Sequence, residues 1–328
     1  MKSHFDASQG DLALQEVPIR TYPGLAWDVL EKLYNDYMGS KGLFASIQRQ
    51  DAPQNLFIPE GMKQGSPEHA LWLFFATMTD RRDVSDNVYR AHVKLHKETP
   101  WLYTEEVIGK DPQEFEPTLK AAGVSMSGAS SRVWPVCAKT LFEVFDGNPL
   151  ALYAEGSIDG ILKWKARRPE VNLPGFGPKI LSLLSLFYEE LGLVTMPKDA
   201  FPVDVHVQRF CIATGIIEAQ GKIHTQNVEK ALRPLLCRIV NQRGWSALEL
   251  SHAIWLLGNR QCTGCHRNGE SQLLCPVYRE CGGPPNTRPY FKKGAWDFDS
   301  PRLRKGGEKT FRIPDDWPLF GTKTADAQ

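Results

Sequence analysis

Two glycines separated by a single residue interrupt a long run of helical periodicity at residues 173–180, LPGFGPKI. Because glycine tolerates backbone conformations that other residues avoid, Gly175 and Gly177 allow the chain to turn tightly at this point. The segment that follows, KILSLLSLFYEELG, is apolar on almost every side, which is typical of a helix at the centre of a bundle. We therefore expect two helices joined by a tight hairpin, with backbone N–H groups presented at the start of the second helix.

Helical periodicity is also the main signal in the rest of the chain, and the two-residue alternation of strands is scarce. Ser66, followed by Pro67 and Glu68, is typical of a helix start, and Ser246 with Glu249 has the spacing of a capping box. Helices are predicted near residues 24–38, 84–97, 112–122, 129–145, 157–165 and 226–241, and after Ser66, Gly177 and Ser246. Short loops with glycine or proline join many of them. These patterns predict an all-α fold.

Composition sets limits on size, partners and compartment. The chain has 328 residues, of which 42% are hydrophobic, so it can bury a substantial core in one large or two smaller domains. Its formal net charge of +1 gives no basic field over the whole surface, and a polyanionic partner would have to meet local patches. The N-terminal residues lack the apolar run of a signal peptide, and no stretch reaches the roughly 18 apolar residues of a membrane span. We therefore expect a soluble intracellular protein with no membrane partner.

The hairpin can bind a phosphate through its backbone N–H groups without a charged side chain. The segment before it, GILKWKARRPEV, adds Lys163, Lys165, Arg167 and Arg168. These four residues form either a solvated basic face or a set of phosphate contacts, and the sequence leaves both interpretations open.

A helix, the motif LPGFGPK, a second helix and then PVDVH at the start of a third helix follow one another along the chain. This order resembles the helix-hairpin-helix DNA glycosylase superfamily, particularly endonuclease III and the 8-oxoguanine DNA glycosylases. The resemblance implies that Lys179 is the catalytic lysine and Asp204 the catalytic aspartate, and that Gly175, Phe176 and Gly177 contact DNA. The spacing between Lys179 and Asp204 is a few residues longer than in the family, which predicts a longer loop through EELGLVTMPKDAF.

The implied chemistry explains why these residue types are needed. A lysine close to an extruded nucleotide can attack the sugar at C1′ once its amine is neutral, giving an imine that permits strand cleavage by β-elimination. An aspartate steadies the positive charge on the sugar as the base departs. The structural alternatives are an exposed helix lysine for Lys179 and a helix N-cap for Asp204, and the second is compatible with catalysis. His206 is interpreted as a supporting or phosphate-facing residue of the DNA site.

Four of the seven cysteines, Cys262, Cys265, Cys275 and Cys281, form the pattern C-x2-C-x9-C-x5-C. Four thiolates at this spacing can hold one metal centre, either a tetrahedral Zn²⁺ or an iron–sulfur cluster, and the spacing does not decide between them. The place of these cysteines in the chain and the closing CPVYREC resemble the C-terminal loop of endonuclease III and its adenine-glycosylase relatives. That resemblance favours a [4Fe-4S] cluster in a structural role, although the order of the ligands is rearranged here.

The segment MTDRRDVSDNVYRAH resembles the junction at which the family inserts a side chain into the duplex. Ser85 and Asn87 belong to the matching DVSxN motif, but Asp80 occupies the position of the inserted wedge. Because an acidic group among bases is electrostatically unfavourable, Arg81 or Arg82 is the alternative inserted residue, and both are predicted to contact DNA. A junction that only caps the following helix is the structural alternative.

The resemblance also implies a two-domain helix-hairpin-helix DNA glycosylase fold with DNA in the cleft between the domains. We expect an N-terminal helix and linker over residues 1–65, a six-helix domain over 66–195, a helical domain with the cysteine loop over 196–281, and a basic and aromatic tail over 282–328. The function predicted is base-excision DNA repair by a monomeric, bifunctional DNA glycosylase and AP lyase acting on double-stranded DNA with a damaged base, oxidised bases being favoured. A monofunctional glycosylase for an unusual base and a non-catalytic, metal-stabilised DNA-binding protein are the alternatives.

Overall fold

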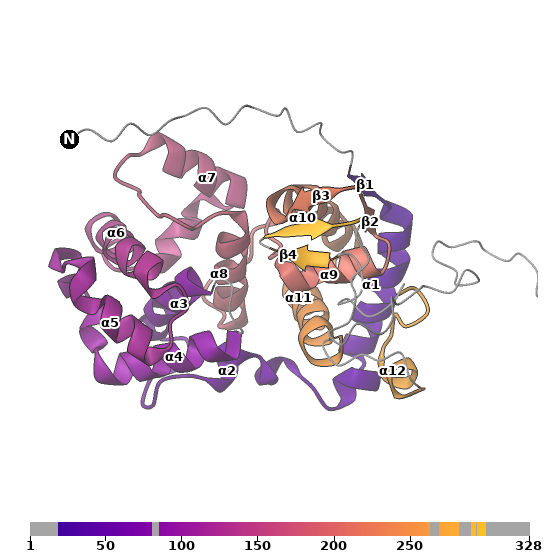
Figure 1. Cartoon of the computed structure of the whole chain (residues 1–328), viewed down its shortest axis with the longest axis horizontal. Coiled ribbons are helices and arrows are strands. Elements are labelled where there is room, and N and C mark those ends of the chain that lie inside the picture. Colours follow the sequence, from indigo (N-terminus) through magenta and orange to yellow (C-terminus); the bar gives the residue numbers. More distant parts are fainter. Residues whose placement is uncertain (1–18, 81–84, 263–268, 282–289, 293, 300–328) are drawn as a thin grey trace, which may run out of the picture.

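Two hydrophobic cores organise the chain, as a computed structural model describes it for residues 19–80, 85–262, 269–281, 290–292 and 294–299 (Figure 1). One core gathers the helices between Ala70 and Ala200, and the other joins the N-terminal helix to the helices after Phe201. The described residues are mostly helical, which confirms the fold class that the sequence predicts. None of the described helices is both long and apolar enough to cross a membrane.

The first half is built around one central helix. Its elements are α3 (Pro67–Thr79), α4 (Ser85–Glu98), η3 (Pro100–Tyr103), η4 (Glu105–Gly109), α5 (Pro112–Ala122), α6 (Ser127–Phe145), η5 (Pro149–Glu155), α7 (Ile158–Arg167) and α8 (Pro178–Glu190). Ser66 caps α3 by accepting a hydrogen bond from the N–H of His69 at 3.1 Å, as predicted. Helix α8 packs against α3, and most of its residues from Ile180 to Tyr188 are buried. Helix α8 is therefore the central helix that its apolar sequence predicts.

The second half joins distant parts of the chain in one core. Its helices are α1 (Pro23–Met38), α9 (Val205–Ala213), α10 (Thr225–Arg243), α11 (Ala247–Leu256), the π-helical turn η6 (Leu257–Gln261) and α12 (Gly269–Leu274). Helix α1 packs against α11 and buries Leu30 and Leu33 in the same core as Leu250. Ser246 caps α11 by accepting a hydrogen bond from the N–H of Glu249 at 3.2 Å, as predicted. The short strands β1 (Arg20–Thr21) and β2 (Ile217–Glu218) pair in antiparallel orientation and connect the segment before α1 to the segment after α9.

The connection between α1 and α3 ties the two halves together. It contains η1 (Gly42–Ala45), η2 (Arg49–Asp51) and α2 (Pro53–Leu56), and it runs along the lower side of both halves in Figure 1. Arg49 pairs with Glu190 of α8 at 3.3 Å and with Glu249 of α11 at 2.7 Å, measured between nitrogen and carboxylate oxygen. The linker therefore contacts both halves through one guanidinium group.

A small antiparallel sheet lies in the second half and includes two strands after residue 281, where the sequence predicts a basic and aromatic tail. Strand β3 (Lys222–His224) pairs with β5 (Ala295–Asp297), and β5 pairs with β4 (Tyr290–Lys292). Trp296 is fully buried, and its indole N–H donates to Oε1 of Gln208 at 2.8 Å. The expectation of a tail therefore does not hold for residues 290–292 and 294–299. Strands of three residues are too short to give a clear two-residue alternation, which is why the sequence did not indicate them.

Candidate active site

The hairpin between α7 and α8 is anchored from inside by the ring of Phe176. Phe176 is 1% exposed and stacks on Phe74 of α3 with ring centroids 4.7 Å apart. Its side chain is therefore part of the first core, and a DNA contact of Phe176 stays a prediction for its backbone alone. Gly175 has a φ of 86°, in the left-handed region, which explains why glycine stands at this turn.

The outer side of the turn carries backbone N–H groups. The N–H groups of Gly175 and Gly177 donate no hydrogen bond to any residue that the structure describes. Gly177 is the N-cap of α8 and brings no side-chain cap, and Gly175 is exposed to solvent. Open N–H groups at a helix start carry partial positive charge and attract anions. The hairpin therefore keeps the groups to which the sequence assigns phosphate binding.

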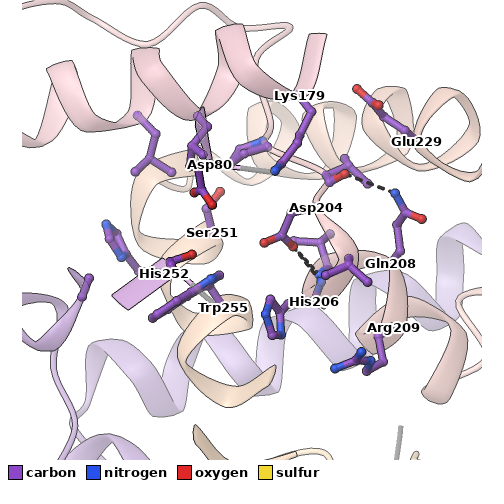
Figure 2. A pocket seen from close by; sticks show the side chains of 18 of the residues that line it. Asp80, Lys179, Asp204, His206, Gln208, Arg209, Glu229, Ser251, His252 and Trp255 are labelled. Carbon is purple, nitrogen blue, oxygen red and sulfur yellow. Dashed lines mark hydrogen bonds between the residues drawn. The ribbon is translucent and has the colours of Figure 1, made fainter. Parts of the chain in front are cut away.

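Lys179 follows the hairpin directly, as the second residue of α8. It is half-buried, and its side chain points into a cavity of about 740 Å³ (Figure 2). The short turn before α8 and the packing of that helix in the first core together fix where this amine lies. Lys179 is thus a wall residue of a cavity and not a freely exposed helix lysine.

Asp204 lies on the same cavity, at the start of α9. Its Oδ1 accepts hydrogen bonds from the N–H groups of His206 at 2.8 Å and Val207 at 2.9 Å (Figure 2). These bonds confirm the predicted N-cap, and they hold the carboxylate in one orientation at the cavity wall. Figure 2 shows the side chains of Lys179 and Asp204 directed into the same space from two different helices.

The longer loop before Asp204 does not separate the two groups. Asp199, in this loop, accepts hydrogen bonds from the N–H groups of Ile158 at 2.8 Å and Asp159 at 2.9 Å, at the start of α7. The loop is thereby tied to the first half while the chain passes into the second. Lys179 and Asp204 consequently line one cavity despite the extra residues between them.

The cavity lies where the two halves meet. Side chains of the first half, the linker, α9, α10, α11 and the small sheet all contribute to its wall, including Gln54, Asp80, Tyr89, Lys179, Phe187, Asp204, His206, Arg209, Glu229, His252, Trp255 and Phe291. Its wall combines aromatic and apolar side chains with a few charged groups, which is typical of a small-molecule or base-sized site.

His206 is a packed part of this wall. Burial lowers the pKa of His206, the carboxylate of Asp204 opposes this, and the charges of Arg209 and Lys179 reinforce it. The ring lies edge-on to Trp255 with centroids 6.1 Å apart. A neutral, packed imidazole favours the supporting role over a cationic phosphate contact.

Glu229 of α10 is a second carboxylate on the cavity that the sequence did not reveal. Burial raises the pKa of Glu229, and the charges of Arg233 and Lys179 partly oppose that rise. Glu229 belongs to no motif, and only the tertiary fold brings it near Lys179, as it brings Arg233 of the same helix to Asp159 of α7. A local sequence signal for this residue therefore does not exist.

Asp80, at the position of the predicted wedge, also lines the cavity. It is the C-cap of α3 and is 9% exposed. Burial raises the pKa of Tyr89 far above its ordinary value, and the nearby charge of Asp80 adds to the effect. Asp80 is therefore a wall residue and not a group available for insertion into a duplex. Arg81 and Arg82 lie outside the described residues.

The cysteine loop is described only in part. Cys262, Cys275 and Cys281 are described, and Cys265 is not. Cys262 and Cys275 both pack against the second core, and the N–H of Cys281 donates to the carbonyl of Val277 at 3.0 Å. Within the described ranges, no three His, Cys, Asp or Glu residues form a group that could hold a metal ion. A four-thiolate centre needs Cys265 as well, so the [4Fe-4S] cluster, with zinc as its alternative, stays a prediction.

Comparisons with known proteins find matches among solved structures. No protein-family model matches the chain, and no curated protein matches it. Among solved structures, the chain is similar to the 8-oxoguanine DNA glycosylase of Thermotoga maritima, with a TM-score of 0.46 and 16% sequence identity over 72% of this chain and 97% of that chain.

Proposed function

We propose that this chain is a helix-hairpin-helix DNA glycosylase with AP lyase activity, which removes a damaged base from double-stranded DNA. The observation that carries the proposal is the presence of Lys179 and Asp204 on one cavity, the first directly after a hairpin with open N–H groups and the second fixed as a helix N-cap. Oxidised bases are the substrate class that the sequence motifs favour.

The hairpin and the cavity suit two successive steps of DNA binding. A phosphate of the DNA backbone would accept hydrogen bonds from the open N–H groups beside the start of α8. Because Lys179 and Asp204 could not reach C1′ of a stacked nucleotide, the target nucleotide would leave the stack and enter the cavity. The cavity volume of about 740 Å³ lies within the range of roughly 300–1,000 Å³ that ligand sites occupy.

Lys179 would supply the nucleophile. Its neutral Nζ forms a bond to C1′ while the bond from C1′ to the base breaks, and the base leaves with the bonding electrons and takes up a proton. Nζ gives up one proton, which supplies the proton taken up by the base. The bond from C1′ to O4′ then breaks while the lone pair of Nζ forms the double bond to C1′, and O4′ takes up a proton from solvent, so that the sugar ring opens to a protonated imine. Loss of a proton from C2′ drives cleavage of the bond from C3′ to oxygen, and the 3′ phosphate leaves as the strand is cut.

Asp204 would stabilise the positive charge that develops on the sugar as the base departs. Two backbone N–H groups already orient its carboxylate, so little reorganisation is needed when that charge appears. Glu229 and Asp80 add two further carboxylates to the same wall. The four groups make a site in which an amine and three acids surround the place of a flipped nucleotide.

Borohydride trapping tests this function. Duplexes that contain an abasic site, thymine glycol, uracil or 8-oxoguanine are incubated with the full chain, and covalent adducts are counted. We expect an adduct with the wild type that is lost in Lys179→Gln and still forms in Lys163→Gln. Lys163 is an exposed residue of α7, so its substitution removes the same charge outside the cavity. Base release without any adduct would favour the monofunctional alternative. Binding without release or adduct on every lesion would contradict the proposal and favour the DNA-binding alternative.

The cysteines complete the proposal. Cys262, Cys265, Cys275 and Cys281 would hold a [4Fe-4S] cluster, or Zn²⁺ in the alternative, and the group would stabilise the loop after η6 without entering the reaction.

A further inference from the structure

Lys165 of α7 contacts the hairpin from inside. Its Nζ donates hydrogen bonds to the carbonyl oxygens of Phe176 at 2.7 Å and Leu173 at 3.1 Å. Lys163, Arg167 and Arg168 on the same segment are exposed, whereas Lys165 is half-buried. Burial lowers the pKa of Lys165, and Cys137 partly opposes this. Lys165 is therefore not part of the solvated basic face that the sequence allows.

Other side chains hold the remaining hairpin carbonyls in the same way. The hydroxyl of Thr140 donates to the carbonyl of Asn172 at 2.8 Å and accepts from the N–H of Asn172 at 3.0 Å. The thiol of Cys137 donates to the carbonyl of Pro174 at 3.8 Å. The inner side of the hairpin is thus lined by carbonyl groups bound from α6 and α7.

Two of the bound carbonyls, those of Phe176 and Pro174, belong to peptide groups whose N–H groups are open. The carbonyl of Phe176 and the N–H of Gly177 share one peptide group, and the carbonyl of Pro174 shares one with the N–H of Gly175. A cation on a carbonyl oxygen polarises its peptide group, so that the N–H at the other end becomes a stronger donor. Lys165 therefore acts through the peptide group on the N-cap of α8.

We propose that Lys165 is a positioning residue of the DNA site, whose ammonium group holds the carbonyls of Leu173 and Phe176 inward and strengthens the outward N–H donor of Gly177 for one DNA phosphate. The inference rests on the proposed DNA binding. Two carbonyls at hydrogen-bond distance suit the compact ammonium of lysine better than the larger, planar guanidinium of arginine. The desolvation of the ammonium is offset by these two oxygens, which a neutral residue could not bind as strongly.

Affinity for an uncleavable abasic-site duplex tests the proposal with the full chain. We expect Lys165→Met to weaken binding by roughly tenfold or more, because a charge-assisted contact is lost. The matched control, Lys163→Met, removes the same charge from the same helix and is expected to weaken binding less than roughly threefold. Thermal denaturation shows whether each variant is folded. Where Lys165→Met does not fold, Lys165→Gln replaces it, since the amide still donates to a carbonyl but carries no charge.

Chemical rescue separates positioning from general stabilisation. Lys165→Ala leaves space beside two carbonyl oxygens, which ethylammonium can fill because it carries both charge and N–H donors. At constant ionic strength, ethylammonium is expected to restore the affinity of Lys165→Ala, whereas tetramethylammonium, with charge but no N–H, is not. Equal losses for Lys165→Met and Lys163→Met, or equal effects of the two cations, would overturn the assignment. A wild-type chain that does not bind the duplex would instead contradict the proposed function itself.

Discussion

Helix α8 has Gly177 as its N-cap and no side-chain cap, whereas at its other end the carboxylate of Glu190 has several partners. Asn55 donates to Glu190 at 2.7 Å and Gln54 donates at 3.1 Å, both from the linker. The guanidinium of Arg49 lies 3.3 Å from the same carboxylate. One end of the helix, its open end, thus lacks a side-chain cap and faces a cavity, where Glu229 bonds to the backbone of Lys179, and the other end is closed by polar contacts.

The two ends of α8 therefore have different roles: the first faces a ligand site, and the last holds the two halves of the molecule together. Burial raises the pKa of Glu190, but the nearby His252 and the amides of Gln54 and Asn55 outweigh it, so that the pKa of Glu190 is lower than usual. These partners come from the linker and from α11, so the contacts at the closed end of α8 connect the first half of the molecule to the second. The open end can then present N–H groups and Lys179 to a ligand without being needed for stability.

The largest expected effect concerns catalysis at the open end. Asp204→Asn keeps a good N-cap but removes the charge, so we expect adduct formation to fall by roughly 10²- to 10³-fold with little change in stability. Asp204→Ala loses the cap as well, and its free energy of unfolding should fall by about 1 kcal/mol. Single-turnover trapping and chemical denaturation measure the two quantities. Activity retained in Asp204→Asn, with the loss of stability confined to Asp204→Ala, would mean that Asp204 is only a cap.

The next effect concerns stability at the closed end. Glu190→Gln should lower the free energy of unfolding by about 2 kcal/mol at pH 7, because a buried carboxylate and its partners lose their pairing. Since the folded-state pKa of Glu190 is below its ordinary value of 4.5, its contribution is complete above pH 4.5 and is lost as the pH falls through the folded value. Denaturation curves of wild type and variant should therefore converge at low pH.

Glu143→Gln is the control for the closed end, since the side chain of Glu143 is 54% exposed. Its stability is expected to follow that of the wild type at every pH. A constant difference between Glu190→Gln and wild type down to the acid transition would show that the carboxylate contributes through packing and not through its charge.

The smallest expected change in adduct formation comes from a substitution in the cysteine loop, because this loop lies in the half of the molecule that does not contain α8. Freshly purified protein should be brown, with broad absorbance near ~400 nm, and Cys262→Ser should lose that colour and much of its thermal stability. Adduct formation by the fraction that stays folded should remain within roughly threefold of wild type. Colourless protein that contains zinc would replace the cluster with the alternative metal.

Local signals gave the helix starts at Ser66 and Ser246, the hairpin and the N-cap at Asp204, because each depends on neighbours within a few residues. The remaining features of the site depend on contacts between segments that are distant in the sequence. Glu229 reaches the cavity only through packing. The role of Lys165 depends on a hairpin that folds back onto α7, and a charged residue in a basic run resembles a solvated one.

Phe176 shows the limit of motif reasoning in particular. Its place between two glycines implied a DNA contact, yet an aromatic ring at the tip of a tight turn is more stable when it stacks on Phe74 in the core. The sheet of β3, β4 and β5 was missed for another reason, because its strands are short and β3 is separated from β4 and β5 by a long stretch of chain.

Mapping the trapped adduct tests the central claim most directly. The borohydride-reduced complex on an abasic-site duplex is digested with nuclease and protease, and the modified peptide is sequenced by mass spectrometry. The account predicts a sugar remnant on Nζ of Lys179, in the peptide that begins α8. A remnant on Lys165, Lys163 or the N-terminal amine, with Lys179 unmodified, would contradict it.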